Sequence, residues 1–316
     1  MNTQSPPAPD TAWTQQRERS QRWVLRLMRW IALRAGRRVA RLVLHPITLY
    51  FFLTGAAVRR ACTSYLGRAL GRPARWSDVY RQIHSFAATV LDRVYLLQGR
   101  YDLFDIDVAG AEEVDRALAD GAGALLVGAH LGSFEALRAL GDRKGLRIAM
   151  LMYEENARLI NATLQSIAPQ AALHTIALGR VDAMLELRRW LEQGGVAGLL
   201  ADRTLPRASG RSRTHRLPFL GAPAPFSDGP FRLAMLMRRP VFFMTGLYLG
   251  GNRYALRFVE LADFSSAVEP GPQNDERVAA ALRRYVATVE ALCIEAPYNW
   301  FNFFDFWADE SPPHPS

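Results

Sequence analysis

Short apolar segments alternate with segments of helical periodicity through the middle of the chain, and this alternation limits the fold more than any other feature. The predicted strands cover Ala124–Gly128, Ile148–Tyr153, His174–Leu178, Val196–Ala201 and Val241–Leu249. The helical patterns between them cover Phe134–Leu140, Arg158–Ile167, Val181–Gln193 and Gly229–Met237. Strands and helices in alternation predict an α/β fold with a mixed, largely parallel central sheet flanked by helices.

Further patterns extend this fold toward both ends of the chain. The run Val241–Leu249 is followed by a second apolar run, Tyr254–Leu261, and the intervening Gly250-Gly251-Asn252 predicts a hairpin turn. Apolar side chains recur at near-helical spacing from Asp78 to Leu97, which predicts a core-facing helix. The last helix is predicted from Glu276 to Ile294. With 49% apolar residues in 316, the chain can bury a sizeable core.

The N-terminal region mixes many arginines with apolar residues, which is typical of a helix lying among lipid headgroups. Its arginines are Arg17, Arg19, Arg22, Arg26, Arg29, Arg34, Arg37, Arg38 and Arg41. The stretch Leu42–Val58 is more apolar, but His45-Pro46 interrupts it, and a spanning helix needs about 20 apolar residues. We favour a monotopic or re-entrant anchor over a spanning helix, with an ordinary buried helix pair as the remaining alternative.

Met1–Ala12 lacks the pattern of a signal peptide, so we expect a cytosolic protein.

The formal net charge of +9 predicts an anionic partner, which could be nucleic acid, lipid headgroups or an acidic protein. No nucleic-acid-binding signature is present, so we expect no nucleic acid partner. The two cysteines, Cys62 and Cys293, match no metal or redox spacing and are interpreted as reduced thiols. The six histidines are scattered without ligand spacing, so we expect no metal.

A histidine stands where the first strand of this sheet is predicted to end. The run Gly121–Gly128 is followed by Ala129 and His130, and ligands bind at this edge of open α/β sheets. On one straight helix, His130 and Glu135 would point about 140° apart. They can meet only if His130 lies in the turn and Glu135 in the first helical turn. Glu135 would then fix the tautomer of His130 and leave its other ring nitrogen as a base. This chemistry suits deprotonating a hydroxyl or amine as it attacks a thioester. The alternative is a helix-capping turn with a half-buried histidine.

The segment His130-Leu131-Gly132-Ser133-Phe134-Glu135 resembles the hallmark of the bacterial lipid A biosynthesis acyltransferases, which belong to the wider lysophospholipid acyltransferase group. That hallmark is a histidine, four residues, then Asp or Glu, commonly with an aromatic residue before the acid. Gly194–Asp202 resembles the second strand of the family. Leu217–Pro230 is similar to its Pro-Phe-Phe-Gly loop and the turn that follows. The resemblance covers roughly residues 82–307.

The resemblance implies a glycerol-3-phosphate acyltransferase-like fold and an acyltransferase without a cofactor, in which His130 is the general base and Glu135 orients it. The implied donor is a thioester of acyl carrier protein, a small acidic protein that a charge of +9 would attract. The implied acceptor is lipid-like, and the implied location is the cytosolic face of the bacterial inner membrane. Two alternatives stay open: a lysophospholipid acyltransferase using acyl-CoA, and a non-catalytic membrane-binding protein.

Several other residues are candidates for substrate binding. Asp202 ends a predicted strand and would line the pocket or cap the next turn. Ser227 and Gly229 would offer backbone N–H groups to a phosphate or carbonyl oxygen, or act as simple helix caps. A developing oxyanion needs a nearby cation, although each candidate arginine could equally lie on a solvated helix face. These arginines are Arg158, Arg180 and Arg203.

The patterns divide the chain into a disordered leader (1–22), a membrane anchor (23–75), an acyltransferase domain (76–308) and a disordered tail (309–316). Two departures from the family remove positive charge. Tyr153-Glu154-Glu155 stands where the family often has Tyr-Arg-Pro, and Trp300–Trp307 stands where it often has a His-Arg-Arg-Phe segment. They suggest a less anionic acceptor than a lipid A precursor, such as an ornithine-type lipid, a glycolipid or an aryl-polyene pigment. We assign the aromatic run itself to packing or interfacial anchoring.

Overall fold

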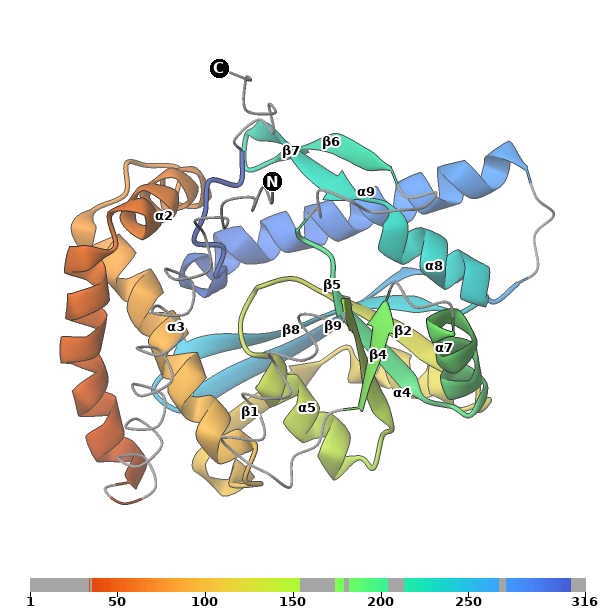
Figure 1. Cartoon of the computed structure of the whole chain (residues 1–316), viewed down its shortest axis with the longest axis horizontal. Helices are drawn as coiled ribbons and strands as arrows, with labels where there is room; N and C mark the ends of the chain where they lie inside the picture. The colour runs from red at the N-terminus through yellow and green to blue at the C-terminus, as the bar shows by residue number, and fades with distance from the viewer. Residues whose placement is uncertain are drawn as a thin grey trace, which may run out of the picture.

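A seven-stranded sheet with the order β1-β9-β8-β2-β5-β3-β4 lies at the centre of the molecule (Figure 1). The computed structural model describes residues 34, 36–153, 174–178, 182–203, 213–266 and 271–307. Neighbouring strands run parallel, except β8 and β9, which form an antiparallel hairpin. The predicted α/β fold with a mixed, largely parallel sheet flanked by helices is therefore confirmed.

The predicted strands and helices within the described ranges are present, close to their predicted ends. The strands of the main sheet are β1 (Asp105–Ala109), β2 (Ala124–Gly128), β3 (Ile148–Tyr153), β4 (His174–Leu178), β5 (Val196–Leu200), β8 (Val241–Gly250) and β9 (Arg253–Ala262). The helices are Gly36–Thr54, α2 (Ala56–Ala69), α3 (Trp76–Leu96), α4 (Ala111–Leu118), α5 (Phe134–Arg143), α7 (Ala183–Glu192), α8 (Gly229–Met237) and α9 (Pro272–Glu295). Short 3-10 turns occur at Tyr101–Leu103 and Pro297–Asn299. The predicted helix Arg158–Ile167 lies outside the described residues.

The core consists of two apolar layers, one on each face of the sheet. All five residues of β2 are buried, and they alternate between the layers because successive strand side chains point to opposite faces. Leu125 and Val127 pack with the layer that contains α2, α7, α8 and α9. Ala124 and Leu126 pack with the layer that contains the helix Gly36–Thr54, α4 and α5. Figure 1 shows α8 and α9 above the sheet and α4 and α5 below it.

The sequence patterns missed helix α4, strand β1 and the pairing of β6 with β7. Strand β1, an edge of the sheet, is mostly exposed and contains Asp105 and Asp107, so it lacks the apolar run of a buried strand. Strands β6 (Thr214–Phe219) and β7 (Ala222–Ser227) pair with each other in a separate antiparallel ribbon. Proline normally argues against a strand, but in a two-stranded ribbon each strand has a free edge that tolerates the missing N–H.

The two N-terminal helices meet at a bend of 94° beside Gly55. A Cβ atom at Gly55 would lie 2.7 Å from the carbonyl oxygen of Phe51, so glycine allows this bend. No single described helix is long and apolar enough to cross a membrane, although this bent pair passes by length and composition. Helix α2 packs into the main core through Cys62, Tyr65 and Leu66. The leader 1–22, the start of the anchor and the tail 309–316 lie outside the described residues.

We predict that Tyr285→Phe lowers the free energy of unfolding by about 1 kcal/mol, because it removes one buried hydrogen bond. The Tyr285 hydroxyl on α9 donates to the carbonyl oxygen of Gly128 at 3.0 Å, where β2 ends. Urea unfolding of the purified protein would measure the change. The same substitution at Tyr50, which is 61% exposed, is the matched control and should have almost no effect. Equal effects at the two positions would contradict the prediction.

Candidate active site

The segment after β2 runs extended along neighbouring backbone before α5 begins. Leu131 forms an isolated bridge with Trp300, and Gly132 forms one with Gly246 of β8. Gly132 has φ +76°, and a Cβ atom there would lie 2.2 Å from the carbonyl oxygen of Gly246. Only glycine fits this close approach. Ser133 then caps α5, because its hydroxyl oxygen accepts a hydrogen bond from the backbone N–H of Ala136.

His130 pairs with Asp202 across the carboxyl ends of two adjacent parallel strands. The register pairs Gly128 of β2 with Leu200 of β5, so His130 and Asp202 each lie two residues beyond a paired position. His130 Nδ1 lies 2.8 Å from Asp202 Oδ1, and the backbone N–H of His130 donates to Oδ2 at 3.0 Å. Since a carboxylate only accepts, this contact places the proton of the neutral imidazole on Nδ1.

The carboxylate of Asp202 is 1% exposed and is held by donors from the C-terminal segment. Trp300 Nε1 donates to Oδ2 at 3.1 Å, and Asn302 Nδ2 donates to the same oxygen at 2.8 Å. Burial alone would raise the pKa of Asp202, but the positive charge that His130 carries when protonated and the hydrogen bonds from His130 and Asn302 outweigh burial and lower it. Asp202 therefore stays ionised and keeps the His130 ring in one orientation.

The second ring nitrogen of His130 is left as a base. The side chain is 28% exposed, so the ring is accessible at the edge of the sheet. Within the described part of the chain, Nε2 has no hydrogen-bond partner. A neutral imidazole with Nδ1–H held by a buried carboxylate can accept a proton at Nε2 from a hydroxyl or amine, and the carboxylate then stabilises the resulting imidazolium.

Glu135 does not take the position that the sequence motif predicted for it. Its Oε1 lies 2.6 Å from Arg93 Nε on α3, an ion pair by distance, and its Oε2 accepts from the Ser133 hydroxyl at 3.4 Å. Residues 131–133, with Gly132 at φ +76°, separate the start of α5 from His130. Among the described residues, the contact with His130 Nδ1 therefore comes from Asp202, and the orienting role of Glu135 stays a prediction.

Arg203 follows Asp202 directly and is held beside it by the C-terminal segment. Its Nε donates to Asn302 Oδ1 at 2.8 Å, and its guanidinium carbon lies 5.4 Å from the centre of the Phe304 ring. Burial lowers the pKa of Arg203, and the charge of Asp202 partly opposes this effect. The other two candidate arginines, Arg158 and Arg180, lie outside the described residues.

Ser227 and Gly229 lie at the start of α8, and no described contact joins either of them to His130 or Asp202. The Ser227 hydroxyl accepts the backbone N–H of Gly229 at 3.2 Å, which is a local capping contact. Between them, Asp228 is 1% exposed and accepts from His215 Nε2 at 3.1 Å and Arg232 Nε at 2.8 Å. This cluster ties the β6–β7 ribbon to α8.

Trp300 and Asn302 are site residues that the sequence patterns missed, since the aromatic run around them was assigned to packing or anchoring. Trp300 is fully buried and also packs in the aromatic cluster with Tyr65, Phe219 and Phe306. The polar Asn302 within an aromatic run is the one signal that could have pointed to the site. In the described ranges, no group of three His, Cys, Asp or Glu residues could hold a metal ion.

A comparison with protein families identifies the kind of domain. The family model described as bacterial lipid A biosynthesis acyltransferase matches residues 95–307. The crystal structure of the 1-acyl-sn-glycerophosphate acyltransferase PlsC from Thermotoga maritima is similar at 15% identity and a TM-score of 0.36. That match covers 80% of this chain and 98% of the other. A search of curated proteins found no match.

We predict that the contribution of Asp202 to the free energy of unfolding decreases as the pH falls. An unfolded aspartate has a pKa near 3.9, and the folded pKa of Asp202 is lower. Its charge therefore stabilises the fold above about pH 4, and this stabilisation is lost as the pH falls through the folded pKa. The loss of unfolding free energy caused by Asp202→Asn should shrink as the pH falls below about 4, as urea unfolding would measure.

Asp120→Asn, at an exposed aspartate, serves as the control and should change stability little at any pH. If Asp202→Asn lowered the free energy of unfolding by the same amount above and below about pH 4, the prediction would be contradicted.

Proposed function

The chain belongs to the bacterial lipid A biosynthesis acyltransferase family and is an acyltransferase, and from this premise we propose that His130 is its general base. In this proposal, a fatty acyl group moves from the thioester of acyl carrier protein to a hydroxyl or amine of a lipid-like acceptor. The observation that carries the proposal is the 2.8 Å contact of His130 Nδ1 with buried Asp202, which leaves Nε2 accessible.

The reaction needs one base and no external reagent. His130 Nε2 accepts the proton of the acceptor hydroxyl or amine while that oxygen or nitrogen attacks the thioester carbonyl carbon. The carbon–sulfur bond then breaks, and the imidazolium returns the proton to the leaving thiolate. Asp202 remains a carboxylate throughout and stabilises the imidazolium, as the buried acid of a catalytic triad does.

The carbonyl oxygen gains negative charge during this attack, so a cation or fixed donor near it would speed the reaction. We propose Arg203 for this role or for binding an anionic group of a substrate. Support comes from its position directly after Asp202 and from the contacts with Asn302 and Phe304 that hold its side chain. Arg158, Ser227 and Gly229 remain proposals for substrate binding.

The proposal also names an acyl donor and a class of acceptor. A net charge of +9 favours an acidic carrier protein as donor, because charge complementarity accelerates docking. Acyl-CoA is the alternative donor. For the acceptor, the loss of family arginines favours an ornithine-type lipid, a glycolipid or an aryl-polyene pigment over a lipid A precursor.

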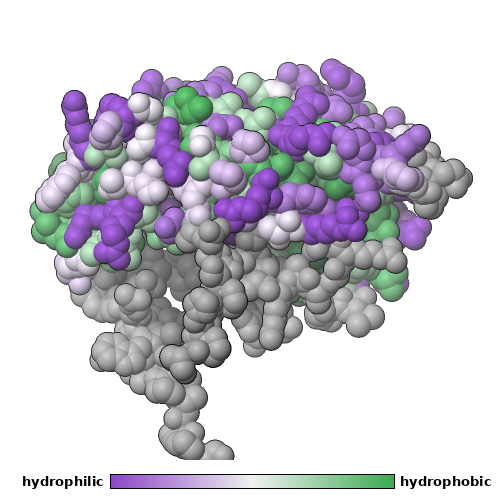
Figure 2. All heavy atoms as spheres, turned by 90° about the horizontal axis from the view of Figure 1, so that it is seen from above, coloured by the Kyte–Doolittle hydropathy of each residue, from purple (hydrophilic) through white to green (hydrophobic). Residues whose placement is uncertain are grey.

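Membership of a lipid acyltransferase family indicates membrane association, and we propose that the chain lies on the cytosolic face of the inner membrane. The helix Gly36–Thr54 supports this proposal, because apolar side chains cover its outer face. They are Val39, Leu42, Leu49, Tyr50, Phe51 and Leu53, which are 44–70% exposed. In contrast, hydrophilic side chains cover much of the coloured surface seen from above in Figure 2. The helix therefore suits insertion among lipid headgroups.

Comparing three variants tests the roles of His130, Asp202 and Glu135. His130→Ala and Asp202→Asn should each lower the rate of acyl transfer by about 10³-fold or more, because an amide at 202 can stabilise the wrong imidazole tautomer. Glu135→Gln should cost less than about tenfold, since it keeps its shape and its contact with Ser133. Release of thiol from acyl carrier protein thioester and from acyl-CoA would measure both the rates and the donor.

Asp78→Asn is the matched control, because Asp78 is also a buried, hydrogen-bonded carboxylate but lies at the start of α3. It should leave the rate of the folded enzyme nearly unchanged. If Glu135→Gln were as damaging as Asp202→Asn, the assignment of Asp202 as the orienting residue would be wrong.

Mass spectrometry of lipids and pigments tests the function in cells. Cells lacking the protein and cells with His130→Ala should both lose one acyl chain from the same species, which identifies the acceptor. If only the deletion changes the extract, the proposed base is wrong and the protein acts by binding.

We predict that the outer face of the helix Gly36–Thr54 binds lipid. Leu42→Ser with Leu53→Ser should weaken binding to vesicles of phosphatidylethanolamine and phosphatidylglycerol by about tenfold or more, because it removes apolar area from the interface. Sedimentation with vesicles would measure the change. Leu236→Ser on α8, at a side chain 69% exposed, is the control and should bind as the native chain does. Equal binding by all variants would contradict the prediction.

A further inference from the structure

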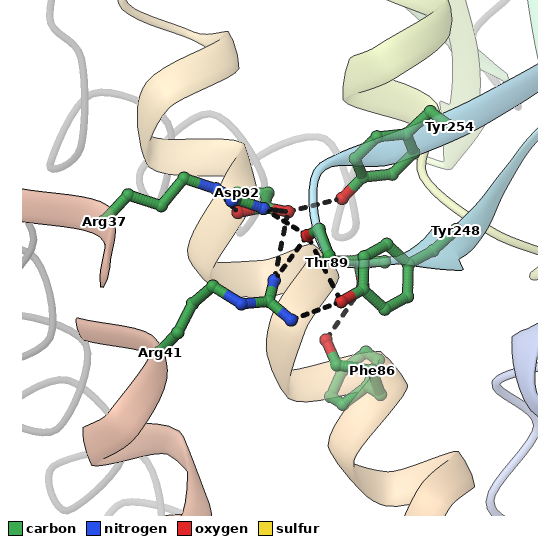
Figure 3. Close-up of polar contacts among 8 residues, drawn as sticks. Arg37, Arg41, Phe86, Thr89, Asp92, Tyr248 and Tyr254 are labelled. Carbon is green, nitrogen blue, oxygen red and sulfur yellow. Dashed lines mark hydrogen bonds and ion pairs between the residues drawn. The ribbon is translucent and has the colours of Figure 1, made fainter. Parts of the chain in front are cut away.

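A carboxylate with no exposed surface lies on α3, outside the site around His130. Asp92 accepts two hydrogen bonds from Arg37, one from Nε to Oδ1 and one from Nη2 to Oδ2, each at 2.8 Å. The Tyr254 hydroxyl donates to Oδ2 at 2.9 Å. Figure 3 shows Arg37 reaching Asp92 from the N-terminal helix and Tyr254 reaching it from the opposite side. A bidentate arginine pair of this kind is directional as well as strong.

The same arginines also hold the turn between β8 and β9. The carbonyl oxygen of Gly251 accepts from Arg37 Nη2 at 2.6 Å and from Arg41 Nη1 at 2.8 Å. Arg41 Nη2 donates to the Tyr248 hydroxyl at 2.6 Å (Figure 3). These contacts join the N-terminal helix, α3 and the β8–β9 hairpin. We call the five side chains the arginine clamp: Arg37, Arg41, Asp92, Tyr248 and Tyr254.

The apolar contacts of the helix Gly36–Thr54 do not specify its position as strongly as the clamp does. Its buried stripe is Ala40, Leu44, Thr48 and Phe52, one residue in every four. If the helix Gly36–Thr54 slid along α3 by one turn, each residue of this stripe would move close to the position that its neighbour in the stripe had occupied. Because apolar contact is non-directional, such a stripe resists sliding only weakly. The directional hydrogen bonds of the clamp favour one position, as buried ionic groups do in some proteins, and the contact of His45 Nδ1 with the Tyr80 hydroxyl at 3.0 Å adds to them further along the helix.

The hairpin that the clamp holds also supports the loop that carries His130. Asn299 accepts the backbone N–H of Tyr248 at 2.7 Å and donates to its carbonyl oxygen at 3.1 Å. The carbonyl oxygen of Asn299 accepts the backbone N–H of Gly132 at 2.9 Å. Phe301 donates its backbone N–H to the carbonyl oxygen of His130 at 2.7 Å. The clamp and the catalytic loop are therefore attached to one rigid hairpin.

We propose that the arginine clamp is a positioning device, which holds the lipid-facing N-terminal helix in one register relative to His130. A bilayer bound to the outer face of that helix then presents its acceptor at a fixed height and angle to His130 Nε2. The catalytic consequence rests on the proposed function, whereas the geometric part does not. The five clamp residues act through the helix and touch no reacting atom.

Distance measurement between two spin labels tests the geometric part. Labels at Leu42→Cys on the helix and Leu236→Cys on α8 report the helix position, and the native Cys62 and Cys293 are buried. With vesicles of phosphatidylethanolamine and phosphatidylglycerol, the otherwise native chain should give one narrow distance distribution. Arg37→Gln with Arg41→Gln should broaden it.

Two further variants keep this test decisive. Arg34→Gln with Arg38→Gln removes the same charge from exposed positions on either side of Gly36, where the helix begins, and should keep the narrow distribution. Arg41→Gln with Tyr248→Phe keeps the Arg37–Asp92 pair, so no buried carboxylate is left without its arginine and the variant should remain folded. It should broaden the distance distribution less than Arg37→Gln with Arg41→Gln does. A narrow, unshifted distribution in both clamp variants would overturn the proposal.

The rate of acyl transfer tests the catalytic consequence. The acceptor probe is total lipid from cells lacking the protein, supplied either as vesicles or in detergent micelles, with acyl carrier protein thioester as donor. The clamp variants should lose about tenfold or more in vesicles but less than about twofold in micelles, where no fixed interface orients the acceptor. If the clamp variants lost the same fraction of their rate in vesicles and in micelles, the clamp would have a merely structural role, and the proposal would be overturned. If the native chain transfers nothing, the proposed function fails, while the spin-label distances still decide the clamp.

Discussion

The buried carboxylate of Asp202 is the interaction on which the arrangement of the site depends. An ionised group without exposed surface is costly unless donors surround it, so its position dictates where those donors must lie. His130 comes from the end of β2, and Trp300 and Asn302 come from the segment after the last helix. The C-terminal segment is therefore part of the site, and the hydrogen bonds that satisfy Asp202 also set the tautomer of His130.

The acid of the sequence motif has a different task from the one its spacing suggests. Glu135 contacts Arg93 on α3 and the Ser133 hydroxyl, so it secures the start of α5 against a neighbouring helix. Gly132 brings the loop against β8 at a distance that no side chain would allow. The motif thus contributes His130 and the course of the loop, while the carboxylate that contacts His130 comes from the neighbouring strand.

The β8–β9 hairpin connects the loop that carries His130 to the N-terminal helix, for which we propose a lipid-facing role. Its inner strand lies beside β2 and supports the loop that carries His130, and its turn is bound by Arg37 and Arg41 of the N-terminal helix. Tyr248 contributes to both contacts of the hairpin. Its backbone N–H donates to Asn299, and its hydroxyl accepts from Arg41. One hairpin therefore contacts both the loop that carries His130 and the N-terminal helix.

The amino-acid sequence by itself determined the alternation of strands and helices, the hairpin and the histidine at a strand end, because these follow from local periodicity and turn residues. It also placed Asp202 at the end of a strand. Only the tertiary structure decided that Asp202, and not Glu135, faces His130. Strand order is not a local property: β3 and β4 come between β2 and β5 in the chain, yet β5 lies directly beside β2 in the sheet. The roles of Trp300 and Asn302 likewise depend on where the chain returns after α9, which no local pattern encodes.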